Sequence, residues 1–308
     1  MSGPQFAAFG EALTDFVRLG DDAWRSVPGG APWNVARAMA AFGVPSAFGG
    51  AISQDCFGDA LWQASLDAGL DLTLLQRVPK APLLAMVHEI DPPRYFFVGD
   101  DSADLHFDLG ALPSAAFADL RWALFGGISL ARQPLSGRLV SLAQDLKERG
   151  VKIAYDPNFR VLMDASYDPV LERMLALADL VKVSSEDVCG LLRTEDAARG
   201  LSALRAMAPE AWFFYTDGAQ PARLLARDGA WEAAPPRVVV ADTVGAGDCS
   251  LAGLLCSLMA TPSAGGEHLR AALAAGAGAC LSAGAVPPTL EQRAELALRV
   301  DVREIAGA

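Results

Sequence analysis

Positive charge is scarce in this sequence. Its 308 residues include 25 Lys and Arg against 37 Asp and Glu, so the formal net charge is -12. Proteins that bind nucleic acids need a basic face for the phosphate backbone, and we therefore expect no nucleic-acid partner. An anionic ligand would have to be held by local backbone amides and a few cations, because the overall field repels it.

Cysteine and histidine are also rare, with five and three residues respectively. Neither type shows the spacing of metal ligands, and the odd number of cysteines favours reduced thiols in a cytoplasmic protein. A basic segment followed by an apolar one is missing near the N-terminus, so no signal peptide is expected. Residues 249–266 and 271–289 carry no charge but are rich in alanine and glycine, which indicates buried helices and no membrane partner.

What the sequence does contain is an alternation of strand-like and helix-like segments. Short apolar runs are separated by amphipathic stretches; they lie at 6–9, 122–125, 151–155, 180–183, 212–215 and 237–240. This alternation predicts a mainly parallel sheet with helices on both faces, and ligands bind such sheets beyond the carboxyl ends of the strands. Five polar residues follow predicted strands and are expected to cluster at one edge; they are Asp15, Asp156, Ser184, Thr216 and Asp242.

Two segments do not fit this alternation. Residues 13–28 are one, and residues 83–107 are the other. The second holds two strand-like runs on either side of a Pro92-Pro93 turn, which predicts an antiparallel hairpin.

The most informative run is Asp-Thr-Val-Gly-Ala-Gly-Asp at residues 242–248, directly before an apolar helix-like segment. The first turn of a helix leaves N–H groups unpaired and carries partial positive charge, so it can bind phosphate. A carboxylate at Asp248 repels phosphate, but it makes sense as the base for a hydroxyl that attacks phosphorus. Three small residues alone would also fit a tight turn, and Cys249 could be read as a nucleophile or as a small buried residue.

The whole run resembles the C-terminal signature of the ribokinase-like sugar kinases, the phosphofructokinase-B family. The resemblance implies that Asp248 is the catalytic base. It also implies that the amides of Gly245, Ala246 and Gly247 form the anion hole, with those of Ala246 and Gly247 holding the phosphoryl group.

A second match lies near the N-terminus, where a Gly29-Gly30 turn precedes a helix that carries Asn34 and runs to about Phe42. It is similar to the N-terminal signature of the same family. By this resemblance Asp15 and Asn34 bind sugar hydroxyls, and Gly29 and Gly30 let the sugar lie against the backbone. Glycine suits this role because it has no side chain to block a close approach.

Further family elements occur in the middle of the chain. Asp-Pro-Asn-Phe-Arg at 156–160 resembles an Asp-x-Asn-x-Arg element, which makes Arg160 a candidate substrate or phosphate contact. The resemblance also implies a set of residues on the nucleotide side; these are Ser184, Thr216, Gly218 and Gly247. Local similarity at 125–130 and 178–184 is greatest to fructokinases.

The chain departs from the family at three places. Ser-Ser-Glu-Asp at 184–187 replaces Asn-x-x-Glu, so Mg²⁺ is assigned to Glu186, to Asp187 or to both. Pro221 replaces a glycine of the nucleotide-side turn and removes one N–H. Residues 97–100 lack the Tyr-Arg pair that many relatives carry. In some relatives a monovalent cation such as K⁺ lies near the anion hole, and Asp242 is the candidate ligand here.

The combined expectation is a three-layer α/β/α, Rossmann-like ribokinase fold that forms one domain over residues 1–308. A small β-sheet lid, formed by about 13–28 and 83–107, covers the sugar and is a candidate homodimer interface. The expected activity is ATP- and Mg²⁺-dependent transfer of a phosphoryl group to a primary hydroxyl of a furanose-type sugar, with fructose placed first.

Several alternatives to this expectation stay open. A 2-keto-3-deoxygluconate kinase, a ribokinase and a nucleoside kinase use the same fold with another acceptor. A non-catalytic sugar- or nucleotide-binding sensor belongs to a different class. A nicotinamide-dependent dehydrogenase would need Gly-x-Gly-x-x-Gly after the first strand. The chain has Gly10-Glu11-Ala12-Leu13 there.

Overall fold

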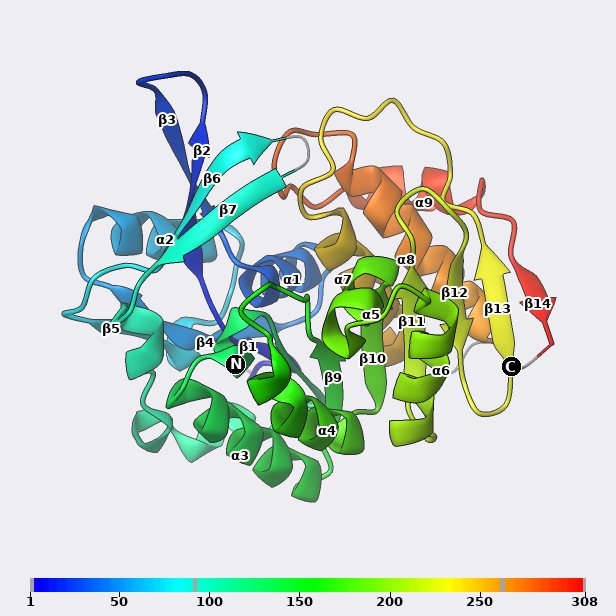
Figure 1. Cartoon of the computed structure of the whole chain (residues 1–308), viewed down its shortest axis with the longest axis horizontal. Helices are drawn as coiled ribbons and strands as arrows, with labels where there is room; N and C mark the ends of the chain where they lie inside the picture. The colour runs from blue at the N-terminus through cyan, green and yellow to red at the C-terminus, as the bar shows by residue number, and fades with distance from the viewer. Residues whose placement is uncertain (1–2, 91–92, 261–263, 307–308) are drawn as a thin grey trace.

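A mainly parallel sheet runs through the middle of the molecule (Figure 1). The computed structural model describes residues 3–90, 93–260 and 264–306. In this part of the chain the sheet has ten strands, in the order β14-β13-β12-β11-β10-β9-β8-β1-β4-β5. The strands from β5 to β11 pair in parallel, and β12, β13 and β14 extend one edge in antiparallel pairing.

The strands of this sheet are short, as is usual for buried parallel strands. Their bounds are β1 Phe6–Phe9, β4 Ser46–Ser53, β5 Leu75–Val78, β8 Trp122–Gly126, β9 Lys152–Asp156, β10 Leu180–Ser184, β11 Trp212–Thr216, β12 Ala222–Leu225, β13 Ala230–Ala233 and β14 Arg303–Ile305.

The helices between them are α1 Ala31–Ala41, α2 Cys56–Asp67, α3 Leu135–Glu148, α4 Asp168–Leu177, α5 Ser185–Leu192, α6 Ala197–Met207, α7 Ala246–Ala260, α8 Gly265–Ala279 and α9 Leu290–Ala297. Short 3₁₀ helices lie at Leu72–Leu74, Ala103–His106, Leu109–Ala111, Ser114–Phe117, Ile128–Ala131 and Ala165–Tyr167.

Alternate residues of the strands face two separate hydrophobic cores. In β1, Phe9 packs in the core that holds α3, α4, α5 and α6, whereas Phe6 packs in the core that holds α1, α7 and α8. Both phenylalanines are fully buried, and burial of such a side chain stabilises the fold by about 1.5–3 kcal/mol. The predicted three-layer α/β/α arrangement is therefore confirmed.

The two uncharged segments form the buried helices α7 and α8, as their composition predicts. Both belong to the core on the Phe6 side of the sheet. Over the described residues, no helix combines the length and the apolar character needed to span a lipid bilayer.

A second sheet of four strands, called the small sheet below, projects from one end of the molecule (Figure 1, upper left). Its order is β3-β2-β6-β7, and the bounds are β2 Leu13–Arg18, β3 Trp24–Gly29, β6 Leu84–Ile90 and β7 Pro93–Val98. The predicted β6–β7 hairpin is present, although Pro92 of its turn lies outside the described residues. Residues 99–107 leave the small sheet and pack beside β4.

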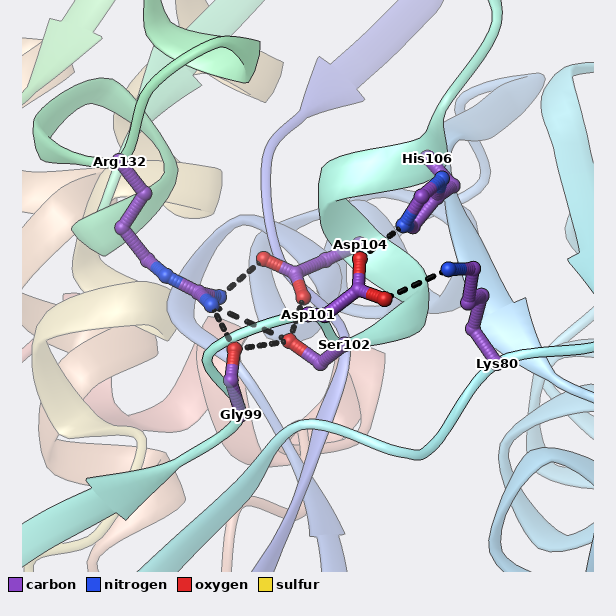
Figure 2. Close-up of polar contacts among 7 residues, drawn as sticks. All are labelled: Lys80, Gly99, Asp101, Ser102, Asp104, His106 and Arg132. Carbon is purple, nitrogen blue, oxygen red and sulfur yellow. Dashed lines mark hydrogen bonds and ion pairs between the residues drawn. The ribbon is translucent and has the colours of Figure 1, made fainter.

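An arginine ties the end of β7 to the body of the protein (Figure 2). The guanidinium of Arg132 pairs with the Asp104 carboxylate and donates a hydrogen bond to the Gly99 carbonyl. The side chains of Asp104 and Arg132 are 1% and 15% exposed. Burial raises the pKa of Asp104, and the Arg132 charge and the hydrogen bond from Ser102 oppose that shift.

Candidate active site

The start of α7 is shaped by a glycine with positive φ. Gly245 has φ +78°, and its carbonyl accepts the first-turn bond from the Cys249 N–H at 2.8 Å. The Ala246 N–H, expected to face the ligand, instead donates to the Thr243 carbonyl at 3.2 Å. Among the described residues, no acceptor is found for the N–H groups of Gly247 and Asp248. The donors available to an anion are therefore those of Gly247 and Asp248.

The predicted strand at residues 237–240 is wrong. Within the described part of the chain these residues pair with no strand, and Val239 and Val240 are 89% and 56% exposed. Consecutive valines have strand propensity, yet a strand also needs a neighbour to pair with. The loop before α7 is held by other contacts: the Ala241 N–H donates to the Cys280 carbonyl, and Asp242 accepts from the N–H groups of Val244 and Gly284 at 3.1 and 2.8 Å.

Asn34 joins the N-terminal motif to α7. Its Nδ2 donates to Oδ2 of Asp248 at 2.9 Å, although the two residues are 214 positions apart. Gly30, with φ +116°, precedes α1 and accepts the Asn34 N–H at 2.8 Å. The Oδ1 atom of Asn34 is buried and has no hydrogen-bond partner in the described part of the chain. It is thus free to accept a hydrogen bond from a hydroxyl beside Asp248.

Asp15 lies in the small sheet, within the segment 13–28 predicted for the lid, which corrects the expectation that it lies at the carboxyl edge of the central sheet. It lies within β2, and a Cβ on Gly29 of β3 would come within 2.3 Å of its Oδ2. Burial raises the pKa of Asp15 to about 6; the Arg160 charge opposes the shift, and Asp248 adds to it. Asp15 of the small sheet and Asp248 of helix α7 therefore lie close enough to influence each other's charge.

Arg160 lies within electrostatic range of both carboxylates and next to the small sheet. Its Nη1 donates to the carbonyls of Asn158 and Phe159 and to Oδ1 of Asn158, at 2.7 to 3.0 Å. Its guanidinium carbon is 5.6 Å from the centre of the Tyr95 ring of β7. Arg160 therefore places a positive charge within electrostatic range of Asp15.

The environment of Asp248 favours its neutral form more than water would. Burial raises its pKa, while the Asn34 hydrogen bond and the charges of Lys182 and Arg160 oppose the shift. The adjacent Cys249 is 3% exposed, and burial raises its pKa to about 12, with Asp248 adding to the shift. The thiol is therefore a neutral core residue and not a nucleophile.

The nucleotide-side residues end two neighbouring strands. Ser184 of β10 lies opposite Thr216 of β11, so both are at the carboxyl edge of the sheet. The Ser184 hydroxyl accepts the Asp187 N–H at 3.0 Å and so caps α5. Gly218 has φ +55° in the turn before β12, where the N–H lost at Pro221 is not needed for a strand pair.

The two candidate magnesium ligands, Asp187 and Glu186, differ in whether their carboxylate oxygens already accept hydrogen bonds. Oδ1 and Oδ2 of Asp187 accept the N–H groups of Phe159 and Ser184 at 2.8 and 2.7 Å. Glu186 is exposed at the start of α5. In the ranges that the structure describes, no cluster of three or more His, Cys, Asp or Glu is placed to hold a metal. Mg²⁺ that arrives with phosphates needs only one or two carboxylates, and Glu186 can supply one.

Lys182 is a residue of this site that the sequence motifs did not single out. It lies in β10 with its side chain 8% exposed, and its Nζ is 3.3 Å from Oδ1 of Asp156 and 3.9 Å from Oδ2 of Asp187. The available signal was a lysine inside the apolar run Leu180-Val181-Lys182-Val183, since a buried lysine needs charged partners.

Comparison with known proteins gives a family match over almost the whole chain. The model of the pfkB family of carbohydrate kinases matches residues 4–293. Probable fructokinase-6, chloroplastic, of Arabidopsis thaliana is 32% identical, over 97% of this chain and 84% of that protein.

Two solved structures have the same fold over almost the whole chain. Fructokinase from Xylella fastidiosa, with bound ATP, has a TM-score of 0.85 and 28% identity, covering 95% of this chain and 98% of that one. Aminoimidazole riboside kinase from Salmonella enterica, complexed with aminoimidazole riboside and an ATP analogue, has a TM-score of 0.82 and 27% identity, covering 95% and 99%.

Proposed function

Because this chain belongs to the pfkB family of carbohydrate kinases, we propose that it phosphorylates a primary hydroxyl of fructose. It is an ATP-dependent sugar kinase, and the identity of the sugar is the proposed part. The observation that carries the proposal is the 2.9 Å hydrogen bond from Asn34 to Asp248. It places a side-chain amide that can bind sugar hydroxyls next to the carboxylate that we propose as the base.

In the proposed reaction the sugar hydroxyl lies between Asn34 and Asp248. Its oxygen forms a bond to the γ-phosphorus of ATP, and the bond from that phosphorus to the β,γ-bridging oxygen breaks. ADP leaves with the electron pair, and the hydroxyl proton passes to Asp248. The N–H groups of Gly247 and Asp248 face the phosphoryl oxygens, where charge has to be stabilised.

Asp15, Asn34 and Arg160 orient the sugar, and Gly29 and Gly30 leave room for it beside the backbone. Positioning supplies much of the rate in phosphoryl transfer, so the raised pKa of Asp248 is compatible with a proton that leaves late. On this proposal the small sheet acts as the lid over the sugar, with Tyr95 and Asp15 on its inner side.

Substitution of Gly29 by alanine tests this positioning. The new Cβ would lie 2.3 Å from Oδ2 of Asp15, and the flexible carboxylate would swing away while the sheet stays folded. We expect kcat/KM for the sugar to fall roughly 10- to 100-fold. Gly20→Ala is the matched control in the turn that joins β2 and β3, because a Cβ there meets nothing within 4 Å. Equal kinetics in the two variants would contradict the role of Asp15.

The pH dependence of kcat/KM should reflect the ionisation of two carboxylates, Asp15 and Asp248. Burial raises the pKa of Asp15 to about 6 and raises the pKa of Asp248 above its ordinary value of 3.8, so each carboxylate takes up a proton at a higher pH than a free aspartate does. We expect the slope of log(kcat/KM) against pH to approach about 2 on the acidic side, and about 1 in Asp15→Asn. The kinetics would be measured from pH 5 to pH 8, a range chosen around these pKa values. The same slope in the wild-type protein and in Asp15→Asn would show that the ionisation of Asp15 does not affect kcat/KM.

For the cofactors, Mg²⁺ would neutralise charge on the ATP phosphates, and Glu186 would hold it. Asp242 is proposed to contribute to a monovalent-cation site beside α7. Burial opposes its ionisation, but the N–H groups of Gly284, Val244 and Thr243 lower its pKa below the ordinary value. Turnover that is unchanged when K⁺ is replaced by a large organic cation would rule out this site.

An assay of ADP release with a panel of acceptors tests the proposed substrate. The panel holds fructose, 2-keto-3-deoxygluconate, ribose and a nucleoside, because relatives of this fold include an aminoimidazole riboside kinase. We expect the highest kcat/KM for fructose. A higher kcat/KM for another acceptor would replace fructose as the proposed substrate. Sugar binding without ADP release would instead favour a non-catalytic sensor.

We also propose a cytoplasmic location and a homodimer through the small sheet. All five cysteines are free thiols, as in a reducing compartment. Apolar side chains are exposed in the small sheet and its β2–β3 turn at Leu19, Trp24, Phe96 and Val98, and contact with a second copy would remove them from water. Sedimentation at the mass of a monomer would contradict the dimer.

A further inference from the structure

The geometry of Lys182 is unusual for a lysine that only supports the fold. Its strand, β10, lies between β9 and β11 in the middle of the central sheet. Leu180, two positions earlier on the same face of β10, packs in the core that holds α7. Because strand side chains alternate between faces, Lys182 points toward the same side. Its ammonium group is thus buried below the start of α7.

The ammonium keeps its proton in this position. Burial alone would lower the pKa of Lys182, but the carboxylates of Asp156, Asp187 and Asp248 outweigh it and raise the pKa. Asp187 does not depend on the lysine for hydrogen bonds, because both of its oxygens accept backbone N–H groups. Lys182 therefore brings a permanent positive charge to a site where the surrounding charges are negative.

The ammonium also has donors to spare. A lysine carries three N–H donors. Within the described residues, the hydrogen bond recorded for Lys182 is the one to Asp156 at 3.3 Å, and the 3.9 Å separation from Asp187 is an ion pair without a hydrogen bond. Two N–H groups are left for a ligand.

Gly247 lies next to these donors. A Cβ on Gly247 would stand 3.7 Å from Nζ of Lys182, so the ammonium borders the backbone whose N–H has no acceptor. Lys182 also lies within electrostatic range of Asp248. The free amides of Gly247 and Asp248 and the spare donors of Lys182 therefore border one another.

We propose that Lys182 is a catalytic residue that contacts the transferring phosphoryl group, together with the amides of Gly247 and Asp248. This inference rests on the proposed function, since that function places the phosphoryl group at α7. The lysine donates hydrogen bonds to phosphoryl oxygens and remains protonated throughout. In the absence of ATP it balances the charge of Asp156 and Asp187.

The test is a double-mutant cycle of Lys182→Met and Asp156→Asn. Methionine has nearly the same length without charge, and the Asn substitution removes the carboxylate that the lost lysine would leave unpaired. We expect kcat to fall roughly 10²- to 10³-fold in Lys182→Met, the range for loss of one donor to a reacting oxyanion. The double variant should stay folded and remain as slow, because Asp156→Asn does not restore the cation.

Binding separates this role from a structural one. Affinities for the β,γ-imido analogue of ATP and for AMP would be measured by calorimetry. Loss of Lys182 should weaken binding of the triphosphate analogue at least 10-fold more than binding of AMP. Lys152→Met is the matched control, because Lys152 lies at the start of the adjacent strand β9, away from the site, with Nζ 5.5 Å from the Trp122 ring.

Two outcomes would overturn the inference. One is a wild-type kcat in the double variant, which would show that Lys182 serves only to pair with the charge of Asp156. The other is equal loss of affinity for AMP and the triphosphate analogue. If the wild-type chain phosphorylates none of the acceptors, the proposed function fails, whereas the binding comparison still decides the role of Lys182.

Discussion

Replacement of Asp248 by asparagine is expected to lower kcat by about 10²–10⁴-fold, the range for loss of a general base. Asparagine keeps the shape of the side chain and can still accept a hydrogen bond from Asn34, which lies 2.9 Å from the carboxylate. It cannot take the hydroxyl proton. ATP should bind at least as tightly as before, because the substitution removes a negative charge beside the phosphates.

The matched control is Asp59→Asn. Asp59 is also an acidic residue in the first turn of a helix, but it lies in α2 and pairs with Arg77. We expect wild-type turnover in this variant. Steady-state ADP release with saturating ATP and sugar measures both proteins, and turnover of Asp248→Asn at the level of Asp59→Asn would refute the assignment of the base.

Replacement of Arg132 by methionine is expected to lower the free energy of unfolding by about 3–5 kcal/mol, the range for breaking a buried ion pair. The loss is large because the Asp104 carboxylate, 1% exposed, would remain without its cation, and the Gly99 carbonyl would lose a donor. Denaturant unfolding followed by circular dichroism measures the change.

The loss should also depend on pH. The pKa of Asp104 in the folded chain is already raised above its ordinary value of 3.8, chiefly by burial, and removal of Arg132 raises it further. The folded variant then holds this proton more tightly than the unfolded chain, so its stability falls as the pH rises above that ordinary value.

Lys80→Met is the comparison for this second prediction. Lys80 pairs with Asp101 in the same part of the chain (Figure 2), but there both side chains are exposed. Exposed ion pairs contribute little to stability, so the unfolding midpoint should hardly change. A small, pH-independent loss in Arg132→Met, equal to that in Lys80→Met, would show that Arg132 does not anchor the small sheet.

The central sheet could be predicted from the sequence because its strands are buried on both faces. Runs such as Phe6–Phe9 are then apolar throughout, and amphipathic helices separate them. The error at residues 237–240 has a physical cause. Valine favours extended backbone wherever it occurs, but only the three-dimensional structure shows whether another strand lies beside it.

The sequence motifs named most of the residues of the candidate site, but they indicated the positions of these residues in space less well. The motifs placed Asn34 and Asp248 in one site, and the hydrogen bond between them agrees. They gave two placements for Asp15: the lid range 13–28 put it in the small sheet, where the structure has it, whereas the strand before it suggested the edge of the central sheet. Lys182 was missed since its role depends on how the carboxylates of Asp156 in β9 and Asp187 in α5 fold around it, which the order of residues does not show.

The burial of the Cys249 thiol, next to Asp248, has a consequence for chemical durability. Peroxide and alkylating reagents attack the thiolate form of cysteine. With a pKa of about 12 and only 3% exposure, Cys249 offers almost no thiolate at neutral pH. The exposed Cys56, on α2, is the more accessible target. Oxidative damage to this enzyme should therefore begin on its surface and leave the catalytic pocket intact.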